Sequence, residues 1–197
     1  MTHRRSRVER ATSETRIDLS LDLDGSGAGT RSTSIGFFDH MLDAFARHGR
    51  FDLEVRAHGD LHVDFHHTVE DVGIALGQAF DQALGDRAGI VRYGSIRLPM
   101  DESLASASID VSGRGLLVYR HEIAWERIGD FPIELAEEFF RALAHNAKIT
   151  LHLAIEYGHD PHHRVEALFK ACARAFHQAT RIDPSHPGIP STKGTLA

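Results

Sequence analysis

The sequence predicts an α+β fold in which one half-domain occurs twice, and two observations predict it. The segment 66–70, His-His-Thr-Val-Glu, recurs 96 residues later as 162–166, His-His-Arg-Val-Glu, in a chain of 197 residues. Strand-like alternation of apolar and polar residues precedes each copy, and apolar residues at helical spacing follow it. We therefore expect each half to form a small, mostly antiparallel sheet with helices on one face.

The first half-repeat is expected to span residues 1–92. Its elements are predicted in this order: a strand over 17–23, a helix beginning near His40, a strand over 51–57 and a helix over 66–84. The last helix places Val72, Leu76 and Phe80 on one apolar stripe, and Gly85 provides its stop.

The second half-repeat is expected to span residues 93–197. Its predicted elements are strands over 103–111 and 116–123, a helix beginning near Glu138, a strand over 149–155 and a helix over 163–180. The tail, 183–197, holds three of the six prolines and is expected to be irregular. Because no Pro- or Ser-rich linker separates the halves, we expect them to pack as one body.

The composition excludes several classes of protein. With 28 acidic and 22 basic side chains the net charge is -6, which argues against binding nucleic acid. The basic stretch Arg4, Arg5, Arg7 and Arg10 is the exception, and we expect it to form a solvated arm. No apolar run approaches the roughly 18 to 20 residues that span a bilayer. The single cysteine cannot form an intramolecular disulfide, in agreement with a reducing, cytoplasmic location.

The duplicated motif has the spacing of a metal site. Residues i and i+4 share one face of a helix, so His66 with Glu70, and His162 with Glu166, can each chelate an ion, whereas the intervening histidines of each copy point elsewhere. We therefore predict two metals, each bound by the pair of one half and the lone histidine of the other. His40 and Glu138 occupy equivalent positions and supply fourth ligands. The predicted sets are His67, His162, Glu166 with His40, and His66, Glu70, His163 with Glu138.

The types of ligand limit which metals fit the two sites, but they do not determine the function. Imidazole and carboxylate ligands without sulfur suit Mn, Fe, Co, Ni or Zn. Two alternatives remain open. One is a di-metal phosphate-ester hydrolase, although such an enzyme would want carboxylate-bridged ions and this ligand set gives each ion its own chelating pair. The other is a non-catalytic metal-storage protein, which would bind metal without turnover.

Seven motifs identify a family. FFDHML, DFHHTVED, RYG, PMDE, DVSGR, PHHRVEALFKA and PSTKG occur in this order. With them the sequence resembles the imidazoleglycerol-phosphate dehydratase family over nearly its whole length, from about Arg10 to Leu196. The resemblance implies a hydro-lyase of histidine biosynthesis that converts D-erythro-imidazole-glycerol phosphate to imidazole-acetol phosphate and water with two Mn²⁺ ions per active site. It also implies a homo-oligomer, typically of 24 subunits, with active sites at subunit boundaries.

The resemblance also implies residue roles. The family's metal ligands fall on the predicted sets, except that many relatives have His where this chain has Glu138. Glu14 matches the catalytic glutamate, expected to act as general acid or base. Lys170 falls on a substrate-contacting stretch, and the phosphate-side positions fall on Arg92, Arg114, Ser191 and Lys193.

Overall fold

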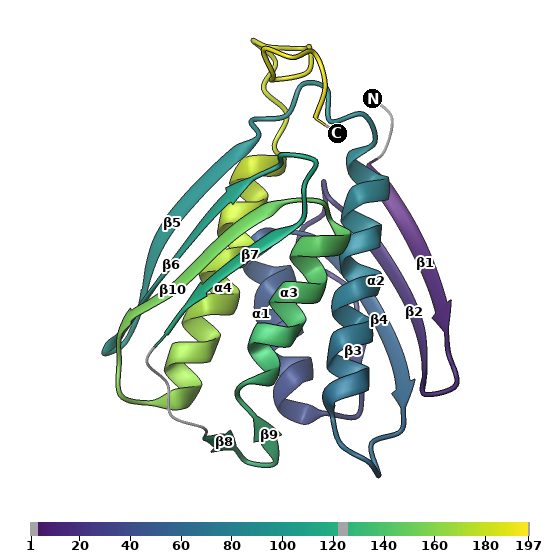
Figure 1. The fold of residues 1–197 in the computed structure, drawn as a ribbon, viewed down its shortest axis with the longest axis vertical. Coiled ribbons are helices and arrows are strands. Elements are labelled where there is room, and N and C mark those ends of the chain that lie inside the picture. Colours follow the sequence, from purple (N-terminus) through teal and green to yellow (C-terminus); the bar gives the residue numbers. More distant parts are fainter. Residues whose placement is uncertain (1–3, 122–125, 197) are drawn as a thin grey trace.

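The computed structural model describes residues 4–121 and 126–196 (Figure 1). The elements of the first half are β1 (Arg5–Ala11), β2 (Thr15–Asp22), β3 (Arg31–Ser32), α1 (Gly36–Gly49), β4 (Asp52–Gly59) and α2 (His66–Leu84). Those of the second half are β5 (Tyr93–Met100), β6 (Ser103–Asp110), β7 (Leu116–Arg120), β8 (Arg127–Ile128), β9 (Phe131–Pro132), α3 (Leu135–Asn146), β10 (Thr150–Tyr157) and α4 (Pro161–Thr180).

The two main sheets have the same topology. Their strand orders are β1-β2-β4-β3 and β5-β6-β10-β7. In each sheet the first three strands pair antiparallel and the last strand pairs parallel. The short β8–β9 hairpin has no counterpart among the described residues of the first half. The predicted fold class, a duplicated α+β unit with mostly antiparallel sheets, is confirmed.

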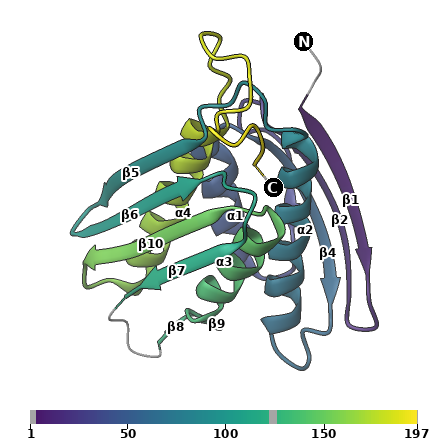
Figure 2. The same cartoon turned by 45° about the horizontal axis from the view of Figure 1, so that its top comes forward.

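The helices fill the space between the two sheets (Figures 1 and 2). The apolar stripe predicted for α2 is buried, and so is its counterpart on α4, Leu168, Cys172 and Phe176. The rings of Phe80 and Phe176 lie 4.5 Å apart between centroids, so the stripes of the two halves meet in one core. The boundary predicted between residues 92 and 93 falls in the segment that joins α2 to β5, and it stays a prediction.

Three of the four N-terminal arginines, Arg5, Arg7 and Arg10, lie in the edge strand β1, so the prediction of a solvated arm is wrong. Arg5 Nε lies 2.6 Å from Asp22, Arg7 Nη2 lies 3.0 Å from Asp18, and Arg10 Nη2 lies 2.8 Å from the buried Asp71. In β1 only Val8 is buried. Edge strands often bear such charges, because charge discourages pairing with other chains. Where charged residues replace apolar ones, the sequence lacks the apolar alternation that predicts a strand.

β5, the matching edge strand of the second half, was not predicted either. Its side chains are half-buried or exposed, and its only buried residue is Gly94. A Cβ at Gly94 would lie 2.1 Å from the carbonyl oxygen of Ala175. Glycine is therefore required where this strand meets α4, although glycine weakens the sequence signal of a strand.

The other differences concern element boundaries. The strand predicted over 116–123 ends at Arg120, and Ile123 lies outside the described residues. Each of the three helices α1, α3 and α4 begins two to four residues earlier than predicted. The tail is irregular as far as residue 196, as predicted. None of the helices in the described part of the chain has the length and apolar character needed to cross a membrane.

Asp52 stabilises the loop between β2 and β3 in a pH-dependent way. Its Oδ1 accepts hydrogen bonds from the backbone nitrogens of Ser26 (2.8 Å) and Ala28 (2.9 Å) and from Ser26 Oγ. These bonds, led by that from Ser26 N, lower the pKa of the Asp52 carboxyl below its ordinary value.

A group with a depressed pKa contributes stability above its unfolded-state pKa and loses it as the pH falls. We therefore expect Asp52→Ala to lower stability at pH 7 by about 1 kcal/mol, after allowance for solvent exposure, or about 3 °C in Tm. The deficit relative to the parent protein should shrink at pH 3. Thermal melting at both pH values checks this, with the exposed Asp130→Ala as control. An equal deficit at both pH values would contradict it.

Candidate functional site

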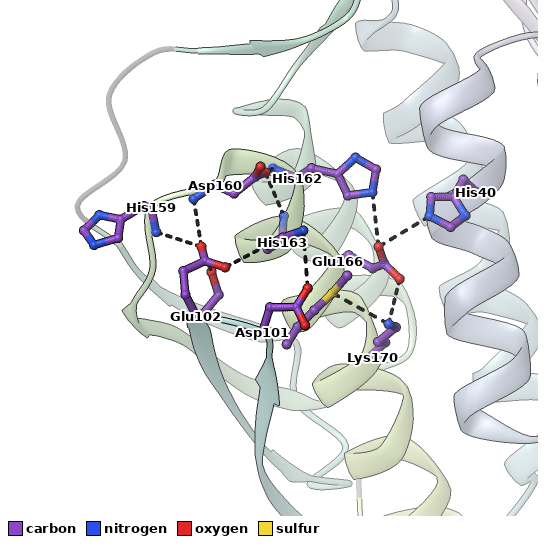
Figure 3. Close-up of polar contacts among 11 residues, drawn as sticks. His40, Asp101, Glu102, His159, Asp160, His162, His163, Glu166 and Lys170 are labelled. Carbon is purple, nitrogen blue, oxygen red and sulfur yellow. Dashed lines mark hydrogen bonds and ion pairs between the residues drawn. The ribbon is translucent and has the colours of Figure 1, made fainter.

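The start of α4 is fixed by a helix cap. Asp160 is the N-cap residue, and its Oδ1 accepts hydrogen bonds from the backbone nitrogens of His162 (2.7 Å) and His163 (3.2 Å). Pro161 occupies the first turn, where a missing N–H costs nothing. The cap sets the register of the helix, so that His162 and Glu166 lie on one face while His163 points away from it (Figure 3).

His40, His162 and Glu166 form the only group of three or more potential metal ligands in residues 4–121 and 126–196 whose ligand atoms all lie within 4.8 Å of one another. Glu166 Oε2 lies 3.1 Å from His162 Nε2 and 3.4 Å from His40 Nε2, which reaches it from α1 (Figure 3). Glu166 is buried, whereas the imidazoles of His40 and His162 are 49% and 40% exposed. The cluster is therefore open on one side.

Lys170 lies one turn beyond Glu166, as its spacing predicted. Its Nζ lies 2.7 Å from Glu166 Oε1 and 3.7 Å from Met100 Sδ. Burial alone would raise the pKa of the Glu166 carboxyl, but the hydrogen bond and charge of Lys170, together with His40, outweigh burial and lower that pKa. Glu166 is thus held as a carboxylate, the form that binds a cation.

The pair at the start of α2 also lies on one helix face. His66 Nε2 and Glu70 Oε2 are 3.8 Å apart, and both side chains are 44% exposed. Glu138 on α3 lies 3.5 Å from Arg141 of its own helix. Three of the four predicted ligands of this second set, His66, Glu70 and Glu138, therefore have at least a third of the side chain exposed in one chain.

The lone histidines of the motif turn to other carboxylates. His67 Nδ1 lies 3.0 Å from Asp60 Oδ2 and 3.8 Å from Glu14 Oε2. His163 Nδ1 lies 2.8 Å from Glu102 Oε2. The hydrogen bonds to Asp60 and to Glu102 raise the pKa values of His67 and His163, respectively. Within one chain, His67 does not join His40, His162 and Glu166, so the four-ligand sets stay predictions.

The four predicted phosphate-side residues line one cavity. Arg92, Arg114, Ser191 and Lys193 surround a volume of about 690 Å³ together with Tyr93, Ser112 and neighbouring tail residues. Arg92 Nε donates to Asp110 (2.7 Å), its Nη1 donates to the carbonyl of Pro190 (2.7 Å), and the first of these bonds raises the Arg92 pKa. Arg92 therefore fastens the tail to β6, and the arginines and lysine give the cavity donors that suit an anion.

This chain is similar in sequence and in fold to known proteins. The sequence model described as imidazoleglycerol-phosphate dehydratase matches residues 33–176. Two proteins of this name, from Geobacter metallireducens and Azorhizobium caulinodans, are 54% and 56% identical to this chain; both alignments cover 98% of it, and they cover 99% and 98% of the relatives. This chain belongs to the imidazoleglycerol-phosphate dehydratase family. The family and the hydro-lyase class predicted from the sequence motifs are thereby confirmed.

Two solved structures of this family have a fold similar to that of this chain. The dehydratase from Staphylococcus aureus has a TM-score of 0.83 at 36% identity, covering 91% of this chain and 99% of that one. The one from Pyrococcus furiosus, solved in complex with (S)-C348, has a TM-score of 0.83 at 34% identity, covering 96% of this chain and all of that one.

The histidine cluster and the cavity lie at opposite ends of α4. The histidine cluster is at its first turns, whereas the cavity adjoins its last turn, where Arg92 N donates to the carbonyl of Ala179. Ala179 stands thirteen positions after Glu166, which corresponds to a rise of about 20 Å along a helix. One small substrate therefore cannot contact both parts of the same chain.

Sequence reasoning missed Asp60 and Glu102, the carboxylates that hold the lone histidines. One signal could have found Glu102: it stands directly before β6, as Glu14 stands directly before β2, at the tip of the corresponding hairpin. Asp60 follows β4 and has no motif around it that marks it out.

Proposed function

We propose that this dehydratase converts D-erythro-imidazole-glycerol phosphate to imidazole-acetol phosphate and water with two Mn²⁺ ions. The convergence of His40, His162 and Glu166 on one point, open to solvent on one side, is the observation that supports a metal most directly. Two imidazoles and a carboxylate, with no sulfur, fit Mn²⁺ and the neighbouring transition metals.

A second copy of the chain would complete each metal site. We propose that His67 of one copy joins His40, His162 and Glu166 of another, and that His163 likewise joins His66, Glu70 and Glu138. The separation of the histidine cluster from the phosphate cavity also favours a site shared between copies. The family resemblance favours a homo-oligomer of 24 subunits.

Different residues of the chain would have different roles in the reaction. When bound, the two ions would supply Lewis-acid stabilisation of negative charge on the imidazole ring as hydroxide leaves. Arg92, Arg114, Ser191 and Lys193 would bind the phosphate. Glu14, beside His67, would move the proton at C2, and Lys170 would contact substrate beside Glu166.

A phosphate ester does not cross a bilayer unaided, so we also propose that the enzyme shares the cytoplasm with its substrate. Membership of a dehydratase family favours this function over the two alternatives left open by the metal-ligand pattern, a phosphate-ester hydrolase and a metal-storage protein.

The test is a turnover assay after the protein has been stripped with a chelator. Manganese is added back, imidazole-glycerol phosphate is supplied, and the enolisable ketone product is followed by its absorbance. We expect turnover that saturates with substrate and depends on manganese. Release of inorganic phosphate would instead support the hydrolase, and two bound metals without turnover would support storage.

Lys193→Ala should raise KM about 10- to 100-fold with a smaller change in kcat. A charge-assisted hydrogen bond to phosphate is worth roughly 1.5–3 kcal/mol, and Lys193 is exposed in the cavity. Lys148→Ala, which removes only a surface ion pair with Asp81, is the control and should leave KM unchanged. Steady-state kinetics of both variants measure this, and an unaltered KM in Lys193→Ala would remove Lys193 from the phosphate site.

A further inference from the structure

The duplication places a glutamate at equivalent points of the two halves. β2 and β6 are both eight residues long, and Glu14 and Glu102 directly precede them at the tips of the β1–β2 and β5–β6 hairpins. Each glutamate lies on the Nδ1 side of the lone histidine of its own half: Glu14 beside His67, and Glu102 beside His163.

The two glutamates differ in how they are held. Glu102 Oε1 accepts hydrogen bonds from Ser103 Oγ (2.9 Å) and from the backbone nitrogens of His159 (3.0 Å) and Asp160 (2.9 Å). Its Oε2 lies 2.8 Å from His163 Nδ1 (Figure 3). Both oxygens of Glu102 are therefore engaged, and the side chain is fixed between the hairpin and the start of α4.

Glu14 does not hydrogen-bond to His67, the lone histidine of its own half. The 3.8 Å between its Oε2 and His67 Nδ1 exceeds hydrogen-bond length, and its side chain is 51% exposed. Asp60 takes that place in the first half, with its two oxygens 3.0 and 3.2 Å from His67 Nδ1. The halves thus hold their lone histidines with different carboxylates.

A carboxylate can only accept a hydrogen bond, so it places the proton of a neutral imidazole on Nδ1. The lone pair is then on Nε2, and the ring plane is fixed. In His163, Asp101 Oδ2 lies 3.7 Å from Nε2, beyond hydrogen-bond length, so this carboxylate does not occupy the Nε2 lone pair with a hydrogen bond.

We infer that Asp60 and Glu102 are positioning residues that present Nε2 of His67 and of His163, respectively, to the two metals. This inference rests on the proposed metal-dependent function. It has a consequence for the chemistry: because Glu102 is fixed by its role in holding His163, Glu14 is the hairpin glutamate that is free to transfer a proton.

Isosteric variants test the inference. In Glu102→Gln the amide oxygen must remain where three donors meet, so its NH₂ group faces His163 Nδ1 and drives the proton to Nε2. In Asp60→Asn the amide can still turn its oxygen to His67, since both carboxylate oxygens lie near Nδ1. We therefore expect Glu102→Gln and Asp60→Ala each to weaken one manganese site about 10- to 100-fold, and Asp60→Asn to retain most of the affinity.

Manganese titration of the stripped protein, followed by the electron paramagnetic resonance of free Mn²⁺, measures both sites without turnover. Glu156→Gln is the control, because Glu156 accepts only from Ser106 in the described hydrogen bonds of β10. Melting temperatures show whether a variant is less well folded. A loss of folding would lower the manganese affinity of Asp60→Asn and of Asp60→Ala alike, whereas the inference predicts a loss in Asp60→Ala only. Parent affinity at both sites in Glu102→Gln and Asp60→Ala would overturn the inference alone, whereas a parent protein that binds no manganese would overturn the proposed function as well.

Discussion

Replacing Glu166 by glutamine will remove one of the two manganese ions that we expect each chain to bind, and will lower kcat/KM about 10³-fold. Glu166 is the only carboxylate of the cluster with His40 and His162, and Lys170 holds it in the charged form. Glutamine keeps the shape and a hydrogen-bond acceptor for Lys170, but it loses the charge that binds the cation.

The measurement is the metal content per chain after gel filtration, together with steady-state kinetics. Glu70→Gln should also remove one ion, from the other site, and a chain with both substitutions should bind neither. Glu54→Gln, an exposed position on β4, should bind both ions and is the control. Two tightly bound ions in the Glu166→Gln variant would show that the cluster is not a metal site.

Much of this cluster follows from the sequence because a helix has a fixed period. The spacing of His162 and Glu166 alone puts their ligand atoms on one face, and the structure places them 3.1 Å apart. His40 was assigned to the same ion as His162 from its place in the repeat, and the packing of α1 against α4 brings them together. The duplicated topology could also be predicted, because the repeat is itself a feature of the sequence.

The remaining parts depend on contacts that no local pattern encodes. The sequence does not predict β1 and β5, because these edge strands have charged residues or glycine at positions where central strands have alternating apolar residues. Asp60 and Glu102 reach their histidines across loops, and acidic residues in loops are ordinarily solvated. The proposed sharing of His67 and His163 between copies of the chain would depend on the geometry of an interface, which the sequence of one chain does not describe.

Glu14→Gln should lower kcat about 10²- to 10⁴-fold while both manganese ions remain bound. The hairpin that bears Glu14 is held firmly: Thr12 Oγ1 accepts from the backbone nitrogens of Glu14 (3.1 Å) and Thr15 (3.0 Å), and Asp60 N donates to the carbonyl of Glu14 (3.1 Å). Thr15 is also bonded to the buried Asp71, which pairs with Arg10. The backbone is therefore fixed while the carboxylate stays half exposed beside His67, an arrangement suited to a group that gives and takes a proton.

Metal content and kinetics together distinguish this role from that of a ligand or a structural residue. A ligand would lose an ion on substitution, and a residue needed only for folding would lower the melting temperature, whereas a proton-transfer residue should change kcat alone. Glu9→Gln, on the neighbouring strand and paired with Arg7, is the control and should leave kcat unchanged. If Glu14→Gln turns over at the parent rate with both ions bound, proton transfer must be assigned to another group near the histidines, and Lys170, already 2.7 Å from Glu166, would be the next residue to substitute.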